Sequence, residues 1–450
     1  MKPSVPDWLS RHLGRPVAIL GGGVSGRAAA GLVEALGGRA VIYDRAYEWS
    51  EFMSFGTEEA ARHDLVVVSP GFAPSHAWVQ AAHTSGCEVL GELDLGALAW
   101  PGGIIAVTGT NGKTTLTEFL AHALRSIGRD ARAVGNVGEA FSDAWRTPGS
   151  KESIAVCEVS SFQAEQLRHF EAAASLWSNF AEDHLERHPT LEGYFRAKYR
   201  LIEHTRGREV FFGPSVRSYA CELGFDLPAG RDVNFEPQPV ESRLADTVFA
   251  RPPQRENFLL ARAMWLGLGF DEDALIKSAA TFELGPHRMA RVREVGGVTF
   301  WNDSKATNFH ATEAALAGFS GPVLWIGGGR SKGGDIHSFA PRIAPRLRRA
   351  FLIGETGAEM ARCLQGLGPS AVHVVSLRDA VHGAYAAAMN GDHVLLSPGF
   401  ASFDMFNGYD DRGRQFEAIV ADLAPAPPKL STSHKPKPVN RPSSPRLCLL

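Results

Sequence analysis

Short apolar runs alternate with helical stretches and glycine-rich turns along most of the chain. Within each run the apolar residues follow one another directly instead of alternating with polar ones. A strand of this kind is buried on both faces, which is typical of parallel sheets that carry helices on both sides. The pattern therefore predicts an α/β fold with mostly parallel strands at residues 17–20, 65–68, 104–107, 154–157, 323–326 and 394–397.

Breaks in this alternation divide the 450 residues into three units, in keeping with the usual size of domains. We expect a Rossmann-like domain at residues 1–99 and a phosphate-loop domain with a mostly parallel sheet at 100–290. A second Rossmann-like domain at 291–423 should open with a hairpin at Val292–Phe300. The Pro- and Lys-rich residues 424–450 bury too little apolar surface to fold and are expected to form a disordered, basic tail.

The composition excludes several classes of protein. The net charge is −3, and because the tail is basic the remaining chain is more acidic still, which argues against nucleic acid as a partner. No segment resembles a secretory signal or a membrane span. The five cysteines lack metal-ligand and redox spacing, so we expect ordinary thiols in a reducing cytoplasm. We also expect a monomer.

A first glycine loop, Gly21–Gly26, satisfies the pattern G-x-G-x-x-G. It follows the strand at 17–20 and opens an Ala-rich helix, and the next strand ends in Asp44. This is the context of a Rossmann nucleotide site, where helix N–H groups face a diphosphate. A dinucleotide, another diphosphate such as a nucleotide-sugar, and a structural turn all remain open.

A second glycine loop, Thr108–Thr115, lies between the strand at 104–107 and a helix predicted at Leu116–Ile127. Backbone N–H groups of such a loop wrap phosphates, Lys113 reaches the β and γ oxygens, and the hydroxyl of Thr114 can bind Mg²⁺. Two such loops imply two phosphate-bearing ligands, which favours an ATP-driven transferase or ligase over a dehydrogenase. The predicted ATP-binding residues in this loop are Gly109, Thr110, Asn111, Gly112, Lys113, Thr114 and Thr115.

Three more residues invite a chemical interpretation. Glu158 ends a buried strand in the phosphate-loop unit, where an acid is a natural Mg²⁺ ligand or general base. A lone histidine is more often structural, but the neighbouring Asp183 and Asn179 raise the case for metal binding by His184. Lys198 lies in a helical run of mixed charge and, taken alone, is predicted to be a surface lysine.

Further segments occur in the order and approximate spacing found in the Mur ligases, the ATP-dependent amide ligases of peptidoglycan synthesis. The resemblance covers about residues 16–420 and is closest to the MurD branch, which adds D-glutamate to UDP-N-acetylmuramoyl-L-alanine. The phosphate loop also resembles that of folylpolyglutamate synthetase. The segments that carry the resemblance are Gly135–Gly138, Glu158–Gln163, Asn179–His184, Arg196–Lys198, Gly285–Arg288, Asn302–Asn308 and Ser397–Asp404.

The resemblance implies a catalytic centre with ATP and two Mg²⁺ ions. Thr114 and Glu158 would hold one ion, and His184 would help to hold the second. Lys198 would be carbamylated by CO₂ and so become an anionic metal ligand. The predicted catalytic residues are Lys113, Glu158, His184, Lys198 and Arg288, and Asn257, Arg288 and Asp303 would contact the nucleotide.

The resemblance also assigns the two other substrates. It directs the first glycine loop toward uridine diphosphate, with Val24, Ser25, Asp44, Arg45, Gly71 and Asn136 on the UDP-substrate. Glutamate carries two carboxylates, so its site requires a cation, hydroxyls and backbone N–H groups. The residues implied there are Lys305, Thr307, Lys332, Ser402, Phe403 and Tyr409, with Asp303 and Lys305 reaching the nucleotide when the domains close.

The chain departs from the family pattern at three places. Pro253-Gln254 stands where relatives have His-Asn, and Pro398–Ser402 and Asn407-Gly408 differ around the amino-acid pocket. The first difference concerns the contacts to adenine, and the two around the pocket leave open D-glutamate, L-glutamate or another acidic amino acid. The rival functions are an NAD-dependent dehydrogenase, which leaves the second loop unexplained, and a silent nucleotide-binding protein, against which the intact catalytic residues argue.

Overall fold

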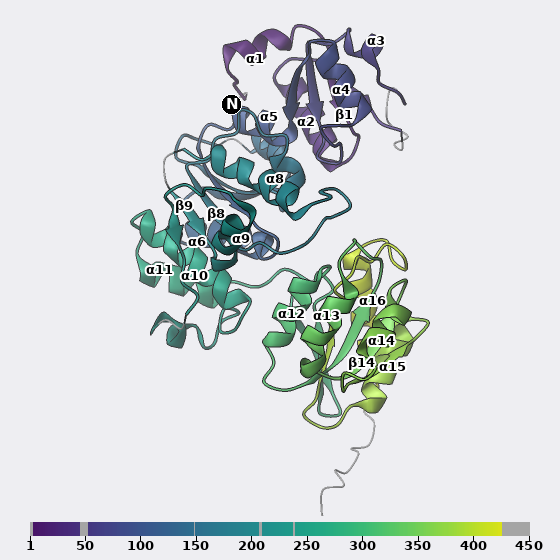
Figure 1. Ribbon diagram of the computed structural model, residues 1–450. Helices are drawn as coiled ribbons and strands as arrows, with labels where there is room; N and C mark the ends of the chain where they lie inside the picture. The colour runs from purple at the N-terminus through teal and green to yellow at the C-terminus, as the bar shows by residue number, and fades with distance from the viewer. Residues whose placement is uncertain (1–2, 46–52, 148, 207–208, 237–238, 425–450) are drawn as a thin grey trace, which may run out of the picture.

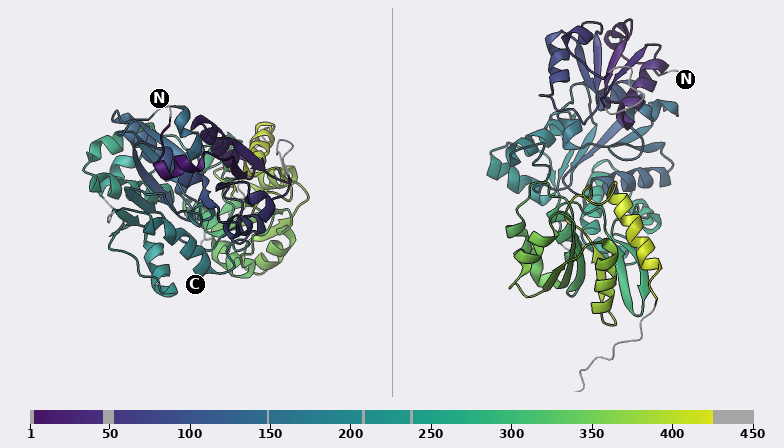
Figure 2. Two further views of the ribbon diagram at one scale, coloured as in Figure 1. Left: turned by 90° about the horizontal axis from the view of Figure 1, so that it is seen from above. Right: turned by 90° about the vertical axis from the view of Figure 1, so that its right-hand side faces the viewer.

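The computed structural model describes residues 3–45, 53–147, 149–206, 209–236 and 239–424. It consists of three α/β units that follow one another in chain order from one end of the molecule to the other (Figures 1 and 2). Each unit has its own sheet. The predicted disordered tail lies outside the described residues from 425 onward.

The first unit contains a four-stranded parallel sheet in the order β2-β1-β3-β4. Its strands are β1 (Val17–Leu20), β2 (Ala40–Tyr43), β3 (Leu65–Val68) and β4 (Glu88–Gly91). The first and third strands are buried at every position, as their continuous apolar runs predict. The helices are α1 (Asp7–His12), α2 (Val24–Ala35), α3 (Thr57–Ala60), α4 (Ala77–Thr84) and α5 (Glu92–Ala99).

The second unit contains a six-stranded parallel sheet in the order β10-β9-β8-β5-β7-β6. The strands are β5 (Gly103–Thr108), β6 (Ala131–Gly135), β7 (Ile154–Glu158), β8 (Ala174–Trp177), β9 (Val210–Phe212) and β10 (Arg231–Asp232). The helical segments are α6 (Lys113–Ser126), η1 (Phe141–Arg146), α7 (Ser161–Ala164), α8 (Leu191–Glu203), α9 (Pro214–Leu223), η2 (Pro239–Leu244), α10 (Gln254–Gly267) and α11 (Glu272–Thr281).

The third unit contains a six-stranded sheet in the order β11-β12-β16-β13-β14-β15. Its first two strands form the predicted antiparallel hairpin, and the remaining pairs are parallel. The strands are β11 (Ala290–Val295), β12 (Val298–Asn302), β13 (Val323–Gly328), β14 (Leu347–Ile353), β15 (Ser370–His373) and β16 (His393–Leu396). The helical segments are α12 (Phe309–Ala317), α13 (Ile336–Ile343), η3 (Ala344–Arg346), α14 (Gly357–Leu364), α15 (Leu377–Ala387) and α16 (Tyr409–Ala421).

The predicted α/β class is confirmed, and all six apolar runs contain strands. The helix after the second glycine loop differs from its predicted start, because it begins at Lys113 and not at Leu116. Gly112 adopts a left-handed conformation with φ of 82° and ends the loop there. Among the described residues, none of the helices has the length and apolar character that crossing a membrane requires.

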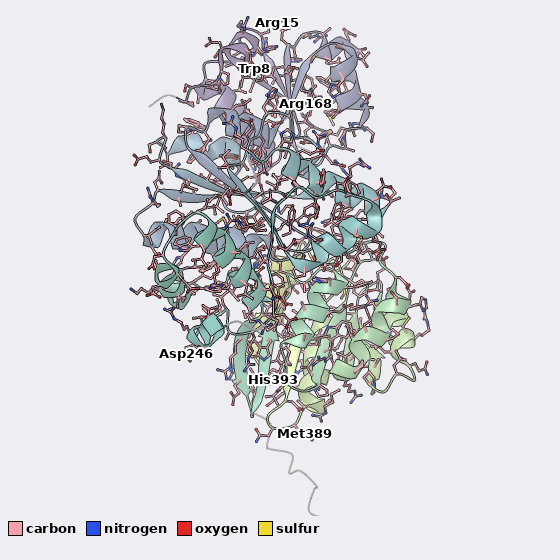
Figure 3. All side chains as sticks on the ribbon, turned by 60° about the vertical axis from the view of Figure 1, so that its left-hand side comes forward. Trp8, Arg15, Arg168, Asp246, Met389 and His393 are labelled. Carbon is pink, nitrogen blue, oxygen red and sulfur yellow. The ribbon has the colours of Figure 1, made fainter. Side chains whose placement is uncertain are left out.

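Buried acids of α5 join the first unit to the second. Asp94 is fully buried and accepts hydrogen bonds from the backbone N–H groups of Arg168, His169 and Phe170, the last at 2.8 Å. The rings of Trp8 and His169 add a contact at 4.7 Å between centroids, and Figure 3 labels Trp8 and Arg168 at this junction. The three N–H donors replace the hydrogen bonds that water would otherwise make to the buried carboxylate of Asp94. This contact therefore stabilises the junction between the first and second units.

We expect Asp94→Ala to destabilise the protein by about 3 kcal/mol, because it leaves three backbone N–H groups without their acceptor. The measurement is urea unfolding followed by tryptophan fluorescence. Asp7→Ala, which removes an exposed acid from α1, should change the free energy of unfolding by less than about 0.5 kcal/mol. Equal stability of the two variants would contradict the anchoring role of Asp94.

Candidate active site

A cavity of about 460 Å³ lies between the second and third units. On one side are residues that follow β5, β6 and β7, which are neighbours in the second sheet. On the other side are residues that follow β12 of the third sheet. The carboxyl ends of parallel strands are where α/β proteins bind ligands, and here two such edges share one cavity.

The second glycine loop has the geometry of a phosphate loop. A Cβ atom at Gly112 would fall 2.3 Å from Oδ1 of Asn257, and one at Gly109 would fall 1.9 Å from Oγ of Ser178. Both glycines also have a positive φ, 82° and 148°. Neither position can therefore carry a side chain, which lets the loop backbone approach a ligand at the start of α6.

Two lysines converge on this loop. Nζ of Lys113 donates to the carbonyl oxygens of Gly109 and Thr110, at 2.9 and 2.8 Å. Nζ of Lys198 donates to the carbonyl oxygen of Gly109 at 2.7 Å. Burial, opposed by the charges of Glu158 and others, lowers the pKa of Lys113.

The prediction that Lys198 is a surface lysine is wrong. Lys198 is 1% exposed, and its ammonium lies 4.7 Å from the ring centroid of Tyr194, one turn earlier in α8. Burial, together with the neighbouring Lys113 ammonium, holds the pKa of Lys198 well below its ordinary value. Mixed charge along the helix concealed this inward position, because sequence alone does not show which polar residue faces the phosphate loop.

Glu158 and Asn136 lie beside the phosphate loop. Oε1 of Glu158 accepts a hydrogen bond from Nδ2 of Asn136 at 2.7 Å. Oε2 is buried and has no hydrogen-bond partner in the part of the chain that the structure describes, although the residue lines the cavity. A buried carboxylate oxygen without a donor is costly unless a cation or ligand completes its environment.

On the side of the third unit, the cavity is lined by Arg288, just before β11, and by Asp303 and Lys305, which follow β12. Nη2 of Arg288 is buried and has no hydrogen-bond partner among the described residues. Asp303 accepts from the hydroxyl of Ser397 at 2.9 Å, and burial raises the pKa of its carboxyl group to about 7. Nζ of Lys305 donates to the hydroxyl of Tyr409 at 3.1 Å. An unpaired guanidinium nitrogen and a lysine therefore face the phosphate loop from the other unit.

Only some of the residues predicted to bind the amino acid lie together in the structure. Thr307, Lys332 and Tyr409 line the cavity, and Nζ of Lys332 donates to Oγ1 of Thr307 at 3.2 Å. Ser402 is buried but outside the cavity lining, and Phe403 is 67% exposed. The structure thus brings together the first three residues, with Lys305, and leaves Ser402 and Phe403 apart.

The first glycine loop lies at the carboxyl edge of the first sheet. The N–H of Gly22 donates to Oδ2 of Asp44 at 2.6 Å. A Cβ at Gly26 would fall 1.7 Å from the carbonyl oxygen of Gly21, so helix α2 can approach the loop only because glycine stands there.

The other predicted UDP-substrate residues are placed as follows. Val24 is 69% exposed, Ser25 is half-buried, and Arg45 lies over the ring of Trp78 at 5.3 Å. The carbonyl of Gly71 accepts from Arg187 of the second unit at 3.4 Å. Asn136 is separate from this group, because it lines the cavity between the second and third units.

Comparison with known proteins identifies the family. Residues 107–216 match the Mur ligase middle domain, and residues 287–400 match the glutamate ligase domain of Mur ligases. A UDP-N-acetylmuramoylalanine–D-glutamate ligase from Caldicellulosiruptor bescii is 35% identical over 391 residues, which cover 80% of this chain and 84% of the relative. The chain belongs to the Mur ligase family. The enzyme of the same name from Caldanaerobacter subterraneus subsp. tengcongensis is 33% identical over 90% of this chain and 98% of its own.

Solved structures show the same fold for this Mur ligase at low sequence identity. The UDP-N-acetylmuramate-alanine ligase MurC from Thermotoga maritima aligns with a TM-score of 0.56 and 16% identity, over 90% of this chain and 99% of that chain. MurF from the same organism, solved in complex with ADP, aligns with a TM-score of 0.53 and 17% identity, over 79% of this chain and 95% of that chain. Family membership leaves no role for the NAD-dependent dehydrogenase considered from the first glycine loop.

The predicted metal ligands of this Mur ligase have mixed donor chemistry. Among the described residues, no three His, Cys, Asp or Glu side chains converge as a metal cluster. The hydroxyl-bearing Thr114 and the free Oε2 of Glu158 line the same cavity and suit Mg²⁺, which takes few protein oxygens and keeps several waters. His184 lines the cavity too, with Nδ1 3.3 Å from Oε1 of Glu186. The residues present therefore fit a divalent cation beside the phosphate loop.

Gln254 and Asn308 line the cavity, although the sequence analysis assigned neither a role in the site. Nδ2 of Asn257 donates to Oε1 of Gln254 at 2.9 Å, so the unusual Gln254 supports the predicted nucleotide-binding asparagine. Asn308 of the third unit binds the phosphate-loop residue Asn111. The sequence signalled Gln254 as a departure from the family pattern and Asn308 as the last residue of the family segment Asn302–Asn308. The contact between Asn308 and Asn111 gave no signal, because the two residues lie 197 positions apart.

We expect Gly112→Ala to weaken nucleotide binding at least tenfold. The new Cβ would require a left-handed conformation, which costs alanine about 1 kcal/mol, and would also meet Asn257 at 2.3 Å. Isothermal titration with ADP measures the effect. Gly103→Ala is the matched control, because a Cβ there meets nothing within 4 Å. Equal ADP affinity of both variants would contradict the role of Gly112.

Proposed function

We propose that this Mur ligase joins D-glutamate to UDP-N-acetylmuramoyl-L-alanine in a reaction driven by ATP. The observation that carries the proposal is the cavity that collects Lys113 and Glu158 of the second unit, Arg288 from the segment before β11, and Lys305 of the third unit. The substrates follow from relatives that share 31–35% identity and the name UDP-N-acetylmuramoylalanine–D-glutamate ligase. The free cysteines among the described residues, Cys87, Cys157, Cys221 and Cys363, suit a cytoplasmic location.

The proposed chemistry overcomes the low reactivity of a carboxylate. A carboxylate oxygen of the UDP-substrate attacks the γ-phosphorus of ATP, and ADP leaves, which produces an acyl phosphate. The amine of glutamate then attacks the carbonyl carbon. The tetrahedral intermediate expels phosphate and loses a proton, leaving an amide. Most of the catalytic work is positioning and charge stabilisation, because three anionic reactants must be brought together.

The cations of the cavity oppose the negative charge of these reactants. Lys113 and the loop N–H groups would hold the β- and γ-phosphates, and the free Nη2 of Arg288 would contact the transferring phosphoryl group. We propose two Mg²⁺ ions, held by Thr114, Glu158, His184 and a carbamylated Lys198, that neutralise phosphate oxygens when bound. Asn257 and Asp303 complete the proposed nucleotide site.

The other two substrates occupy opposite sides of this centre in the proposal. The UDP group would lie on the first glycine loop, near Asp44, and Asn136 would contact the substrate where it enters the cavity. Lys332, Thr307 and Lys305 supply the cations and hydroxyl that two carboxylates require. Ser402 and Phe403 remain assigned to this site only through the family resemblance, since they lie outside the cavity lining.

The proposed carbamylation of Lys198 has a physical basis in its environment. The amine that attacks CO₂ must be neutral, and burial beside Lys113 lowers the pKa of Lys198 well below its ordinary value. The carbamate product is an anion. Carbamylation would therefore replace the repulsion between Lys198 and the Lys113 ammonium by attraction. Nearby Mg²⁺ would stabilise that anion further.

We expect Lys198→Ala to lower kcat by roughly 10²–10³, the usual cost of removing a charged group from such a site. Added acetate, a carboxylate that fits the vacated space, should restore part of the activity. The measurement is phosphate release with and without acetate. Lys151→Ala, at an exposed position of the same unit, should leave the rate of phosphate release unchanged both with and without acetate. Full activity of Lys198→Ala without acetate would contradict carbamylation.

The experiment that tests the proposed function is phosphate release from ATP with UDP-N-acetylmuramoyl-L-alanine and one amino acid at a time. We expect release with D-glutamate, and at most a few per cent of that rate with L-glutamate, D-aspartate or no amino acid. Mass spectrometry should then find the product heavier by one glutamate residue. Phosphate release that does not depend on an amino acid would overturn the ligase proposal, and a preference for L-glutamate would overturn the stereochemical part.

A further inference from the structure

One side chain at the boundary between the second and third units uses its whole hydrogen-bonding capacity. Oδ1 of Asn308 accepts from the N–H of Ala311 at 2.9 Å, which caps α12, and from Nδ2 of Asn111 at 3.1 Å. Its Nδ2 donates to Oδ1 of Asn111 at 3.1 Å and to Oδ2 of Asp183 at 2.8 Å. An amide has two donors and two acceptor sites, so the native contacts satisfy Asn308 completely.

The partner of this side chain belongs to the phosphate loop. The N–H of Asn111 donates to Oδ1 of Asn179 at 2.9 Å, and its carbonyl accepts from Oγ of Ser178 at 2.6 Å. The backbone of Asn111 is therefore fixed within the second unit, and its side chain extends to the third. There it meets Asn308 and also Nδ1 of His310, at 3.0 Å from its Nδ2.

The second contact of Asn308 leads to the proposed amino-acid site. Oδ1 of Asp183 lies 3.6 Å from Nζ of Lys332, which donates to Thr307 next to Asn308 in the chain. The two carboxylate oxygens of Asp183 thus contact the amide of Asn308 and the ammonium of Lys332, one each.

We propose that Asn308 is a positioning residue that couples nucleotide occupancy of the phosphate loop to assembly of the amino-acid site. The reciprocal amide pair between Asn111 and Asn308 holds the third unit against the loop, and a nucleotide bound to the loop would fix Asn111 in this position. Asp183 then sets Lys332 and Thr307 to receive the carboxylates of the amino acid. The identity of that amino acid rests on the proposed function, whereas the coupling rests on the contacts of Asn308.

The first test is steady-state kinetics of Asn308→Ser. Serine still caps α12 but is too short to reach Asn111 and Asp183. We expect the KM for D-glutamate at saturating ATP to rise about tenfold, within the usual range of coupling between sites. The KM for UDP-N-acetylmuramoyl-L-alanine should stay within about twofold. Asp271→Ser, which changes the cap of α11 far from the boundary, is the matched control and should leave all three KM values unchanged.

A double-mutant cycle separates coupling from general damage. If Asn111 and Asn308 act together, Asn111→Ala combined with Asn308→Ser should raise the KM for D-glutamate no further than the larger single effect. His310→Ala, which removes one contact and no cap, should raise it about two- to threefold. Multiplicative effects in the cycle, or an equal rise in the KM values of all three substrates, would overturn the proposal.

Small-angle X-ray scattering tests the coupling without turnover. Adding adenylyl imidodiphosphate and Mg²⁺ should reduce the radius of gyration of the native protein and of Asp271→Ser, but not that of Asn308→Ser. This outcome supports the coupling even if D-glutamate proves not to be the substrate, so the two proposals fail separately. An identical response of native protein and Asn308→Ser, or no response of either, would overturn the coupling.

Discussion

Two ammonium groups meet at the carbonyl oxygen of Gly109, with Lys113 at 2.9 Å and Lys198 at 2.7 Å. Burial lowers the pKa of both side chains, and the Lys113 ammonium lowers the pKa of Lys198 further. Such a concentration of positive charge is stable only when anions lie close to it. Glu158 and Asp183 supply two of them, and the phosphates of a nucleotide would supply the rest. The glycines of the loop serve this constraint, because they let the backbone enclose the space in which the charges gather.

The same constraint explains why the site is divided between two units. The edge of one sheet can direct only a few cations at a ligand. Here Lys305 and Lys332 approach from the third unit, opposite the phosphate loop, and Arg288 approaches from the segment that joins the two units. Catalysis then depends on how closely the units approach. The contacts of Asn308 lie at this boundary and involve both the loop and the anion Asp183. Binding energy from one substrate can in this way prepare the site of another.

Much of this architecture could be predicted because it is local. Continuous apolar runs predicted the buried strands, and the spacing of glycines predicted both loops. The start of α6 was predicted three residues late, because the left-handed Gly112 ends the loop and makes Lys113 helical at once. Lys198 was predicted to be exposed, since its helix shows mixed charge and the buried partner, Gly109, is distant in sequence. The contact between Asn111 and Asn308 gave no signal, because it joins residues from different units.

The sequence by itself determined which segments become strands, where phosphate can bind, and to which family the chain is similar, since these depend on short-range patterns and on motifs in order. Only the tertiary structure decided that Lys198 is buried, and that Thr307 and Lys332 line the cavity while Phe403 is exposed. It also decided that Oε2 of Glu158 and Nη2 of Arg288 lack hydrogen-bond partners among the described residues. The physical reason is that burial, pKa and pairing depend on distances between residues far apart in the chain, and these exist only after the units have packed.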